Sequence, residues 1–210
     1  MSKLFPGLVL PTTVVGSYPV VKGRGISGLF DPYRHAVRIA VADQLAAGID
    51  IISDGQVRGD MVNMFTGLIP GIRGVEVIGP VSPASRPITV SDTSYALSEA
   101  SKVKGIITGP TTLSFALHIT TPSYRNRGEL ALDLSHVLAR EAELLEAAGV
   151  SIIQIDEPIL STGAADIRSA AEAIHYTTRG LSAPVCLHVC GDISTVLHEL
   201  LSFPVGILDF

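Results

Sequence analysis

The amino-acid sequence predicts an α/β protein, and within that class an incomplete (β/α)8 TIM barrel with about six of the eight β/α units present. Three observations support this prediction. Short β-branched runs alternate with longer helical patterns along the chain, which is the order of a βαβ series. Several of the short runs are apolar throughout, as in parallel strands that are covered on both faces. Polar residues gather where these strands end, and barrel enzymes place their chemistry there.

The chain is expected to fold as a single partial barrel domain over residues 1–210. Six strands are expected, at residues 12–16, 50–53, 105–108, 151–155, 185–189 and 206–210. Helices are expected at 33–47, 94–102, 130–148, 165–179 and 193–201. Gly48 and Gly149 stand just before the second and fourth strands, where glycine commonly ends a helix. The runs 75–81 and 86–90 flank a Pro/Ser turn, which predicts a hairpin insertion near 75–90.

An open, doubly wound sheet is the alternative arrangement for six parallel strands. Such a sheet usually carries a glycine-rich G-x-G-x-x-G loop after its first strand, and the sequence there is Gly16-Ser17-Tyr18-Pro19. The barrel is therefore favoured. Because a complete barrel takes about 250 residues, the chain is expected to stop at its sixth strand. Two sheet edges would then be exposed, and self-association through them is expected.

Composition narrows the classes of partner and compartment. The 210 residues are 47% hydrophobic with a net charge of −5, which suits a packed core and disfavours nucleic acid or an anionic membrane as a partner. No apolar run reaches the roughly 18 residues of a membrane span, and residues 1–11 lack the pattern of a signal peptide. Cys186 and Cys190 lie roughly 13 Å apart along one strand, too far for a disulfide. Free thiols and a cytoplasmic location are expected.

His188 and Cys190 form a His-x-Cys pair at the end of the fifth predicted strand. The two-residue period of a strand sends both side chains to one face, with their Cα atoms roughly 7 Å apart. Imidazole and thiolate together suit zinc better than magnesium or calcium. Two ligands do not complete a zinc site, however, and a buried Cys beside a hydrogen-bonded His is the competing interpretation.

Two further groups of residues end predicted strands. Gln154 and Asp156 point to one face of the fourth strand and Glu157 points to the other, so Asp156 is a candidate to hold an ammonium or act as a base. A helix cap or a loop salt bridge is the alternative for either carboxylate. After the first strand, the backbone N–H groups and the hydroxyl of Gly16-Ser17 could receive a carboxylate, unless this is a plain turn.

Taken together, five stretches resemble the catalytic domain of the cobalamin-independent methionine synthase family, in its short, single-domain archaeal-type form. They are TTVVGSYP at 12–19, SDGQVRGDMV at 53–62, GPTTL at 109–113, QIDEPIL at 154–160 and HVCGD at 188–192. The resemblance follows the family order and spans the chain. It implies a barrel of the methionine synthase/uroporphyrinogen decarboxylase-like type and a zinc-dependent methyltransferase that makes methionine from homocysteine.

The resemblance also implies roles for individual residues. His188 and Cys190 match two zinc ligands, and the family's remaining ligands, a glutamate and a cysteine, would lie beyond Phe210. Asp156 matches the carboxylate that holds the amino group of homocysteine. Substrate contacts are further implied for the turn Val15, Gly16 and Ser17, for Asp54 or Gln56 in the second-strand loop, and for Arg86 on the hairpin, which could instead be a solvated rim charge.

Departures from the family pattern concern the methyl donor. Family members that use a folate stack it on a tryptophan, but the matching position is Ala116 and the chain has no Trp. A second glutamate of those enzymes aligns with Thr162. A methyl-corrinoid donor is therefore at least as well supported as 5-methyltetrahydrofolate.

Two alternatives stay open at this stage. Coenzyme M methyltransferases of the uroporphyrinogen-decarboxylase-like barrels also use a His-x-Cys zinc pair on a thiol, although the Gly16-Ser17 turn with Asp156 favours an amino acid. The second alternative is a truncated or split partial barrel that is inactive on its own; for these 210 residues by themselves, weak or absent zinc binding and negligible activity are expected.

Overall fold

The computed structural model describes residues 5, 10–21 and 31–210, and most of the N-terminal segment used for the localisation prediction lies outside them. Its main sheet has four parallel strands: β3 (Lys104–Thr108), β5 (Ile152–Asp156), β6 (Val185–His188) and β7 (Ile207–Asp209). Parallel bridges from Thr13 to Ile51 and from Ile52 to Val103 continue the series before β3. Each unit pairs with the next unit along the chain, which is barrel order, whereas a doubly wound sheet reverses direction.

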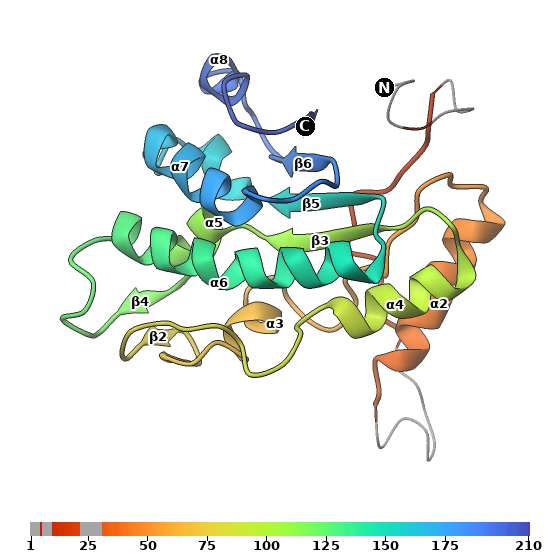
Figure 1. Ribbon diagram of the computed structural model, residues 1–210, viewed down its shortest axis with the longest axis horizontal. Helices are drawn as coiled ribbons and strands as arrows, with labels where there is room; N and C mark the ends of the chain where they lie inside the picture. The colour runs from red at the N-terminus through yellow and green to blue at the C-terminus, as the bar shows by residue number, and fades with distance from the viewer. Residues whose placement is uncertain (1–4, 6–9, 22–30) are drawn as a thin grey trace.

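Helices cover the outer side of this sheet, as Figure 1 shows for α6, which runs alongside β3. Asn126 caps the start of α6 by accepting a hydrogen bond from the Glu129 N–H, and Asp166 caps α7 through the Ser169 N–H. Gly149 ends α6 in a left-handed conformation, as expected from the sequence. The helices are α2 (Arg34–Ala46), α3 (Asn63–Thr66), α4 (Val90–Glu99), α5 (Pro110–Ala116), α6 (Arg127–Ala148), α7 (Ile167–Thr178) and α8 (Leu197–Leu200), with a 3-10 turn η1 (Pro158–Thr162).

The predicted strand positions agree with β3, β5, β6 and β7 to within one or two residues. The first two predicted strands differ, because each is reduced to isolated bridges around Thr13 and residues 51–52. Side chains supply part of the pairing there: the Thr12 N–H donates to the Asp50 carboxylate at 2.8 Å. The last predicted helix, at 193–201, contracts to the single turn of α8, and α5 was not predicted.

The hairpin differs from the expected one in position and length. Its strands are β1 (Ile72–Arg73) and β2 (Glu76–Val77), and β2 pairs in parallel with β4 (His118–Ile119) to complete a small second sheet. Residues 86–90, expected as its second arm, instead lead into α4, which begins four residues earlier than predicted.

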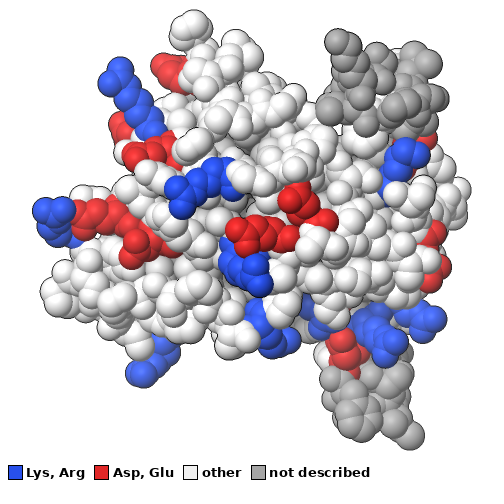
Figure 2. Space-filling view, in the orientation of Figure 1, with Lys and Arg blue, Asp and Glu red and all other residues white. Residues whose placement is uncertain are grey.

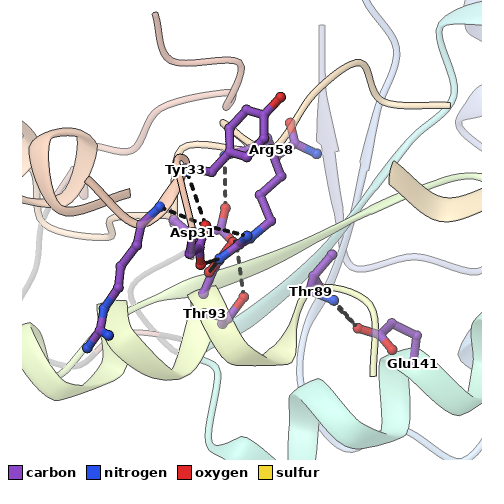
Figure 3. Close-up of polar contacts among 10 residues, drawn as sticks. Asp31, Tyr33, Arg58, Thr89, Thr93 and Glu141 are labelled. Carbon is purple, nitrogen blue, oxygen red and sulfur yellow. Dashed lines mark hydrogen bonds and ion pairs between the residues drawn. The ribbon is translucent and has the colours of Figure 1, made fainter. Parts of the chain in front are cut away.

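A buried carboxylate explains the early start of α4. Glu141 of α6, only 3% exposed, accepts hydrogen bonds from the N–H of Ile88 at 2.9 Å and from the N–H and hydroxyl of Thr89 at 2.7 and 2.9 Å (Figure 3). These bonds satisfy groups at the open N-terminal end of the helix. Long-range capping therefore overrides the strand propensity of the β-branched residues in this segment.

On the face shown in Figure 2, Lys and Arg side chains are interspersed among Asp and Glu side chains. Within the described part of the chain, no helix combines the length and the apolar composition that crossing a membrane requires.

Candidate active site at the carboxyl ends of the strands

Four polar residues stand side by side where the parallel strands end. Asp156 of β5 is in register with Thr108 of β3 on one side and with His188 of β6 on the other, and His188 is in register with Asp209 of β7. Neighbouring strands lie about 4.8 Å apart. The candidate carboxylate and the candidate metal ligand, which are 32 positions apart in the sequence, therefore lie next to each other.

Two turns with left-handed residues meet above this row. Gly16 and Ser17 have φ of 131° and 54°, and Gly55 and Gln56 have φ of 84° and 51°. The turns are joined by a hydrogen bond from the Tyr18 N–H to the Gly55 carbonyl at 2.8 Å. A Cβ on Gly16 would lie 2.5 Å from the Gln56 side-chain oxygen, so only glycine fits there without displacing that side chain.

Asp156 is the residue on which these elements converge. Its Oδ1 accepts a hydrogen bond from Gln154 Nε2 at 2.7 Å, and its Oδ2 accepts one from Gln56 Nε2 at 3.5 Å. Gln154 Nε2 also donates to the Val15 carbonyl at 3.0 Å. Burial raises the pKa of Asp156, opposed by the hydrogen bond from Gln154 and the charge of His188. The structure thus brings together Val15, Gly16, Gln56, Asp156 and His188 from the predicted set.

Asp54 does not point into this group. Its carboxylate accepts hydrogen bonds from the Gln56 N–H at 2.9 Å and from the Thr93 hydroxyl of α4 at 3.1 Å. Of the two residues proposed for the second-strand loop, Gln56 therefore reaches Asp156, while Asp54 faces the helix layer.

The buried Asp54 should make stability depend on pH. Burial raises its pKa from 3.8 to about 6, and the charge of Asp92 adds to the rise. An acid with a raised folded-state pKa contributes stability below its unfolded pKa and loses it as the pH rises through the folded value. The near-isosteric Asp54→Asn should therefore remove a fall of about 2–3 kcal/mol in the free energy of unfolding between pH 4 and pH 7. Urea titrations followed by circular dichroism across this range test the expectation, and parallel pH curves for the two proteins would contradict it.

Arg58 ties the second-strand loop to the surrounding helices. Its guanidinium donates to both carboxylate oxygens of Asp31, at 3.0 and 2.8 Å, and it also pairs with Asp92 of α4 (Figure 3). These ion pairs hold the loop that carries Gln56. Arg86 lies outside the Asp156 cluster and lines, with Arg58, a cavity of about 430 Å³ beside α3 and α4.

His188 is the last residue of β6, and Cys190 lies two residues beyond the strand, which is shorter than predicted. The side chain of His188 is largely buried, and its Nδ1 lies 3.0 Å from Asp209 Oδ2. Cys190 is exposed and Cys186 is buried, and both are free thiols, as predicted. Burial raises the pKa of Cys186 to about 12. The described residues contain no group of three or more His, Cys, Asp or Glu side chains that could hold a metal.

The donor set nevertheless fits part of a zinc site. Pairing of Nδ1 with a carboxylate leaves Nε2 of His188 as the nitrogen for a metal, and zinc-bound histidines usually have such a second partner. Imidazole with an exposed thiol is a combination that zinc prefers. His188 and Cys190 can therefore occupy two zinc positions, and other ligands must complete the coordination.

Glu157 proves to be a helix cap, the alternative considered from the sequence. It is fully buried on the opposite face from Asp156 and accepts hydrogen bonds from the Thr111 N–H at 2.9 Å, the Thr112 N–H at 2.6 Å and the Thr112 hydroxyl at 2.6 Å. Burial raises its pKa to about 7. The strand alternation had separated the two adjacent carboxylates correctly.

Sequence reasoning missed two residues of the cluster. Gln154 was placed on the face of Asp156, yet its amide was not recognised as the group that joins Asp156 to the first turn. Lys104, at the start of β3, was also missed. A lysine directly before a buried apolar strand such as Ile106-Ile107 could have indicated a buried cation. Burial lowers the pKa of this lysine, against the opposing charges of neighbouring groups that include Asp209 and Asp156.

Comparison with protein families gives one extensive match. A family described as "Cobalamin-independent synthase, Catalytic domain" matches residues 10–210. The methionine synthase of Methanocaldococcus jannaschii is 46% identical over 213 residues, covering 94% of this chain and 68% of that protein. The methionine synthase of Methanothermobacter thermautotrophicus is 44% identical over 223 residues, covering 94% and 71%. The chain thus spans about two thirds of the length of these relatives.

Solved structures give the same fold. A B12-independent methionine synthase from Shewanella sp. W3-18-1, in complex with selenomethionine, has a TM-score of 0.77 at 29% identity and covers 86% of this chain and 61% of the other. A putative B12-independent methionine synthase from Listeria monocytogenes has a TM-score of 0.72 at 17% identity, covering 95% and 72%. At that identity the second match supports the fold alone.

Proposed function

This chain belongs to the cobalamin-independent methionine synthase catalytic-domain family, whose members are methyltransferases, and we propose that it transfers a methyl group to the sulfur of homocysteine to form methionine. In the proposed reaction the new carbon–sulfur bond forms as the bond between the methyl group and its donor breaks, and the thiol proton is released. The main structural support for this proposal is the position of Asp156, which lies between the Val15–Ser17 turn and His188.

Such an arrangement suits an amino acid that carries a thiol. The Asp156 carboxylate can pair with the substrate ammonium, and the backbone N–H groups of Gly16 and Ser17 can receive its carboxylate, because successive backbone N–H groups in a turn can form an anion-binding concavity. Gln56 would complete the pocket for the amine in place of Asp54. Selenomethionine, present in the Shewanella relative, is an amino acid of the same shape as the proposed product.

Zinc is the metal that we propose for His188 and Cys190. When bound, it would favour the thiolate form of homocysteine, since coordination to a cation lowers the pKa of a thiol. Asp209 holds the His188 ring by its Nδ1, so that the orientation of the ring is set before a metal arrives. The Asp156 and Gly16-Ser17 contacts fix the other end of the substrate, which makes the approach of sulfur and methyl group an oriented encounter.

The methyl donor is proposed to be a methyl-corrinoid in preference to a folate. The chain has no Trp to stack on a pterin, and Ala116 stands at the expected position. Arg86 is proposed to contact an anionic part of the donor, because it lines the cavity of about 430 Å³ beside the second-strand loop. Free thiols at Cys186 and Cys190 suit a cytoplasmic location.

A methyl-transfer assay tests the proposal directly. The protein, supplied with Zn²⁺, is offered homocysteine or coenzyme M as acceptor and methylcobalamin or 5-methyltetrahydrofolate as donor. We expect methionine to form from homocysteine, and faster with the corrinoid. Methylation of coenzyme M alone would contradict the assignment of the acceptor.

The two cysteines allow a matched test of the metal site. Loss of an outer partner of a metal-bound histidine typically costs 10–100-fold in affinity, so we expect Asp209→Asn to weaken zinc binding by about that factor and Cys190→Ala to weaken it by more than about 100-fold. Cys186→Ala, which removes the buried thiol two positions before His188, should leave zinc affinity unchanged. Competition with a chromogenic chelator measures all three, and equal effects of the two cysteine substitutions would argue against Cys190 as a ligand.

A further inference from the structure

Lys104 is a buried cation in the interior of the sheet, below the candidate site. It is the first residue of β3, and only 2% of it is exposed. Its side chain lines a cavity of about 120 Å³ together with Gln154, Cys186 and Asp209. Burying an ammonium group is costly unless hydrogen bonds compensate, and Lys residues are rarely buried without such partners. Its Nζ donates to Gln154 Oε1 at 2.6 Å.

This hydrogen bond determines which way the Gln154 amide faces. An ammonium group has donors and no acceptor, so the amide must turn its oxygen toward Lys104. The NH₂ group is then directed away from Lys104, where it donates to Asp156 Oδ1 at 2.7 Å and to the Val15 carbonyl at 3.0 Å. If the amide were reversed, its oxygen would face both the carboxylate and the carbonyl, and both hydrogen bonds would be lost.

We infer that Lys104 is a positioning residue for the amino-acid end of the substrate, acting through the Gln154 amide on Asp156 and on the turn that begins at Val15. The inference rests on the proposed function, because it presumes that Asp156 pairs with an ammonium group. Lys104 itself does not touch the substrate. It holds the carboxylate and the carboxylate-binding turn at a fixed separation, so that one ligand can engage both.

Two ligands separate this role from a merely structural one. L-Methionine carries the ammonium group that Asp156 would bind, and 4-(methylthio)butanoate is the same molecule without it. We expect Lys104→Met, which replaces the ammonium-bearing chain by an unbranched apolar chain one atom shorter, to weaken methionine binding about tenfold, the effect of one hydrogen bond to a charged group. Binding of 4-(methylthio)butanoate should weaken clearly less than that of methionine, since this ligand keeps its carboxylate contact with the turn but has no ammonium group to pair with Asp156. Isothermal titration calorimetry measures both affinities.

Lys104→Arg provides the rescue. A guanidinium also has donors and no acceptor, and the adjoining cavity gives it room, so the variant should bind methionine nearly as the parent does. Cys186→Ala alters the same cavity next to Gln154 but removes none of the hydrogen bonds of the Gln154 amide, and it should not change the preference for methionine over the deaminated ligand. If Lys104→Met does not fold, Lys104→Gln replaces it, because an amide can accept as well as donate and no longer dictates the orientation of Gln154. The same selective loss is expected from it.

The outcomes distinguish the inference from the proposed function. If the parent protein binds neither ligand, the proposed function fails and the inference fails with it. If the parent binds methionine and Lys104→Met binds it equally well, only the inference is overturned. An equal loss of both ligands would also overturn it, because that result indicates a general structural role.

Discussion

Replacing Glu157 with alanine is expected to lower the free energy of unfolding by about 3–5 kcal/mol. The substitution leaves three buried donors of Thr111 and Thr112 without their acceptor, and each unsatisfied group costs about 1–3 kcal/mol. It also opens a cavity next to Gly109, where an added Cβ would lie 2.2 Å from the Glu157 carboxyl carbon. Chemical unfolding monitored by circular dichroism measures the loss, since the chain has no Trp for fluorescence.

Glu157→Gln is the matched control for this prediction. With its amide oxygen in the place of Oε2, the variant can still accept both hydrogen bonds from Thr112, but its NH₂ group would then face the Thr111 N–H. We therefore expect a loss of about 1–3 kcal/mol, smaller than for alanine. Equal stability of the parent protein and Glu157→Ala would show that the carboxylate does not anchor the start of α5.

The difference between Asp156 and Glu157 was visible in the sequence. Strand alternation alone assigns the two carboxylates to opposite faces, and β5 confirms this assignment. The apolar run before His188 located the end of β6, and the order of the strands along the chain predicted the barrel. These features depend on local patterns, which a single sequence displays directly.

Interactions between distant segments were not visible. The cap that Glu141 gives to Thr89 joins residues 52 positions apart, and it converts a predicted strand into the start of α4. The contact of Gln56 with Asp156 spans 100 positions. Nothing in the local sequence indicates that Gln56 would face the site while Asp54 would face Thr93. The resemblance to the family located the loop, and only the fold distinguishes between its two polar residues.

Asp156→Asn is expected to weaken methionine binding by about 100-fold or more, the second large effect. Removing one partner from a buried, hydrogen-bonded charge pair typically costs 2–5 kcal/mol, and Asp156 is only 5% exposed. The near-isosteric amide also places an NH₂ group where either Gln154 or Gln56 now donates. One of these hydrogen bonds is then lost, and the asparagine NH₂ group cannot accept a hydrogen bond from the substrate ammonium.

Three comparisons show whether this loss reflects recognition of the ammonium group. Binding of 4-(methylthio)butanoate, measured by the same calorimetry, should be unaffected by Asp156→Asn. Asp54→Asn should leave methionine affinity unchanged, because that carboxylate faces α4 and not the site. Glu157→Gln should alter stability and leave affinity within about twofold, since its side chain lies on the other face of β5. If Asp156→Asn and Glu157→Gln weakened methionine binding equally, the division of β5 into a ligand face and a structural face would be wrong.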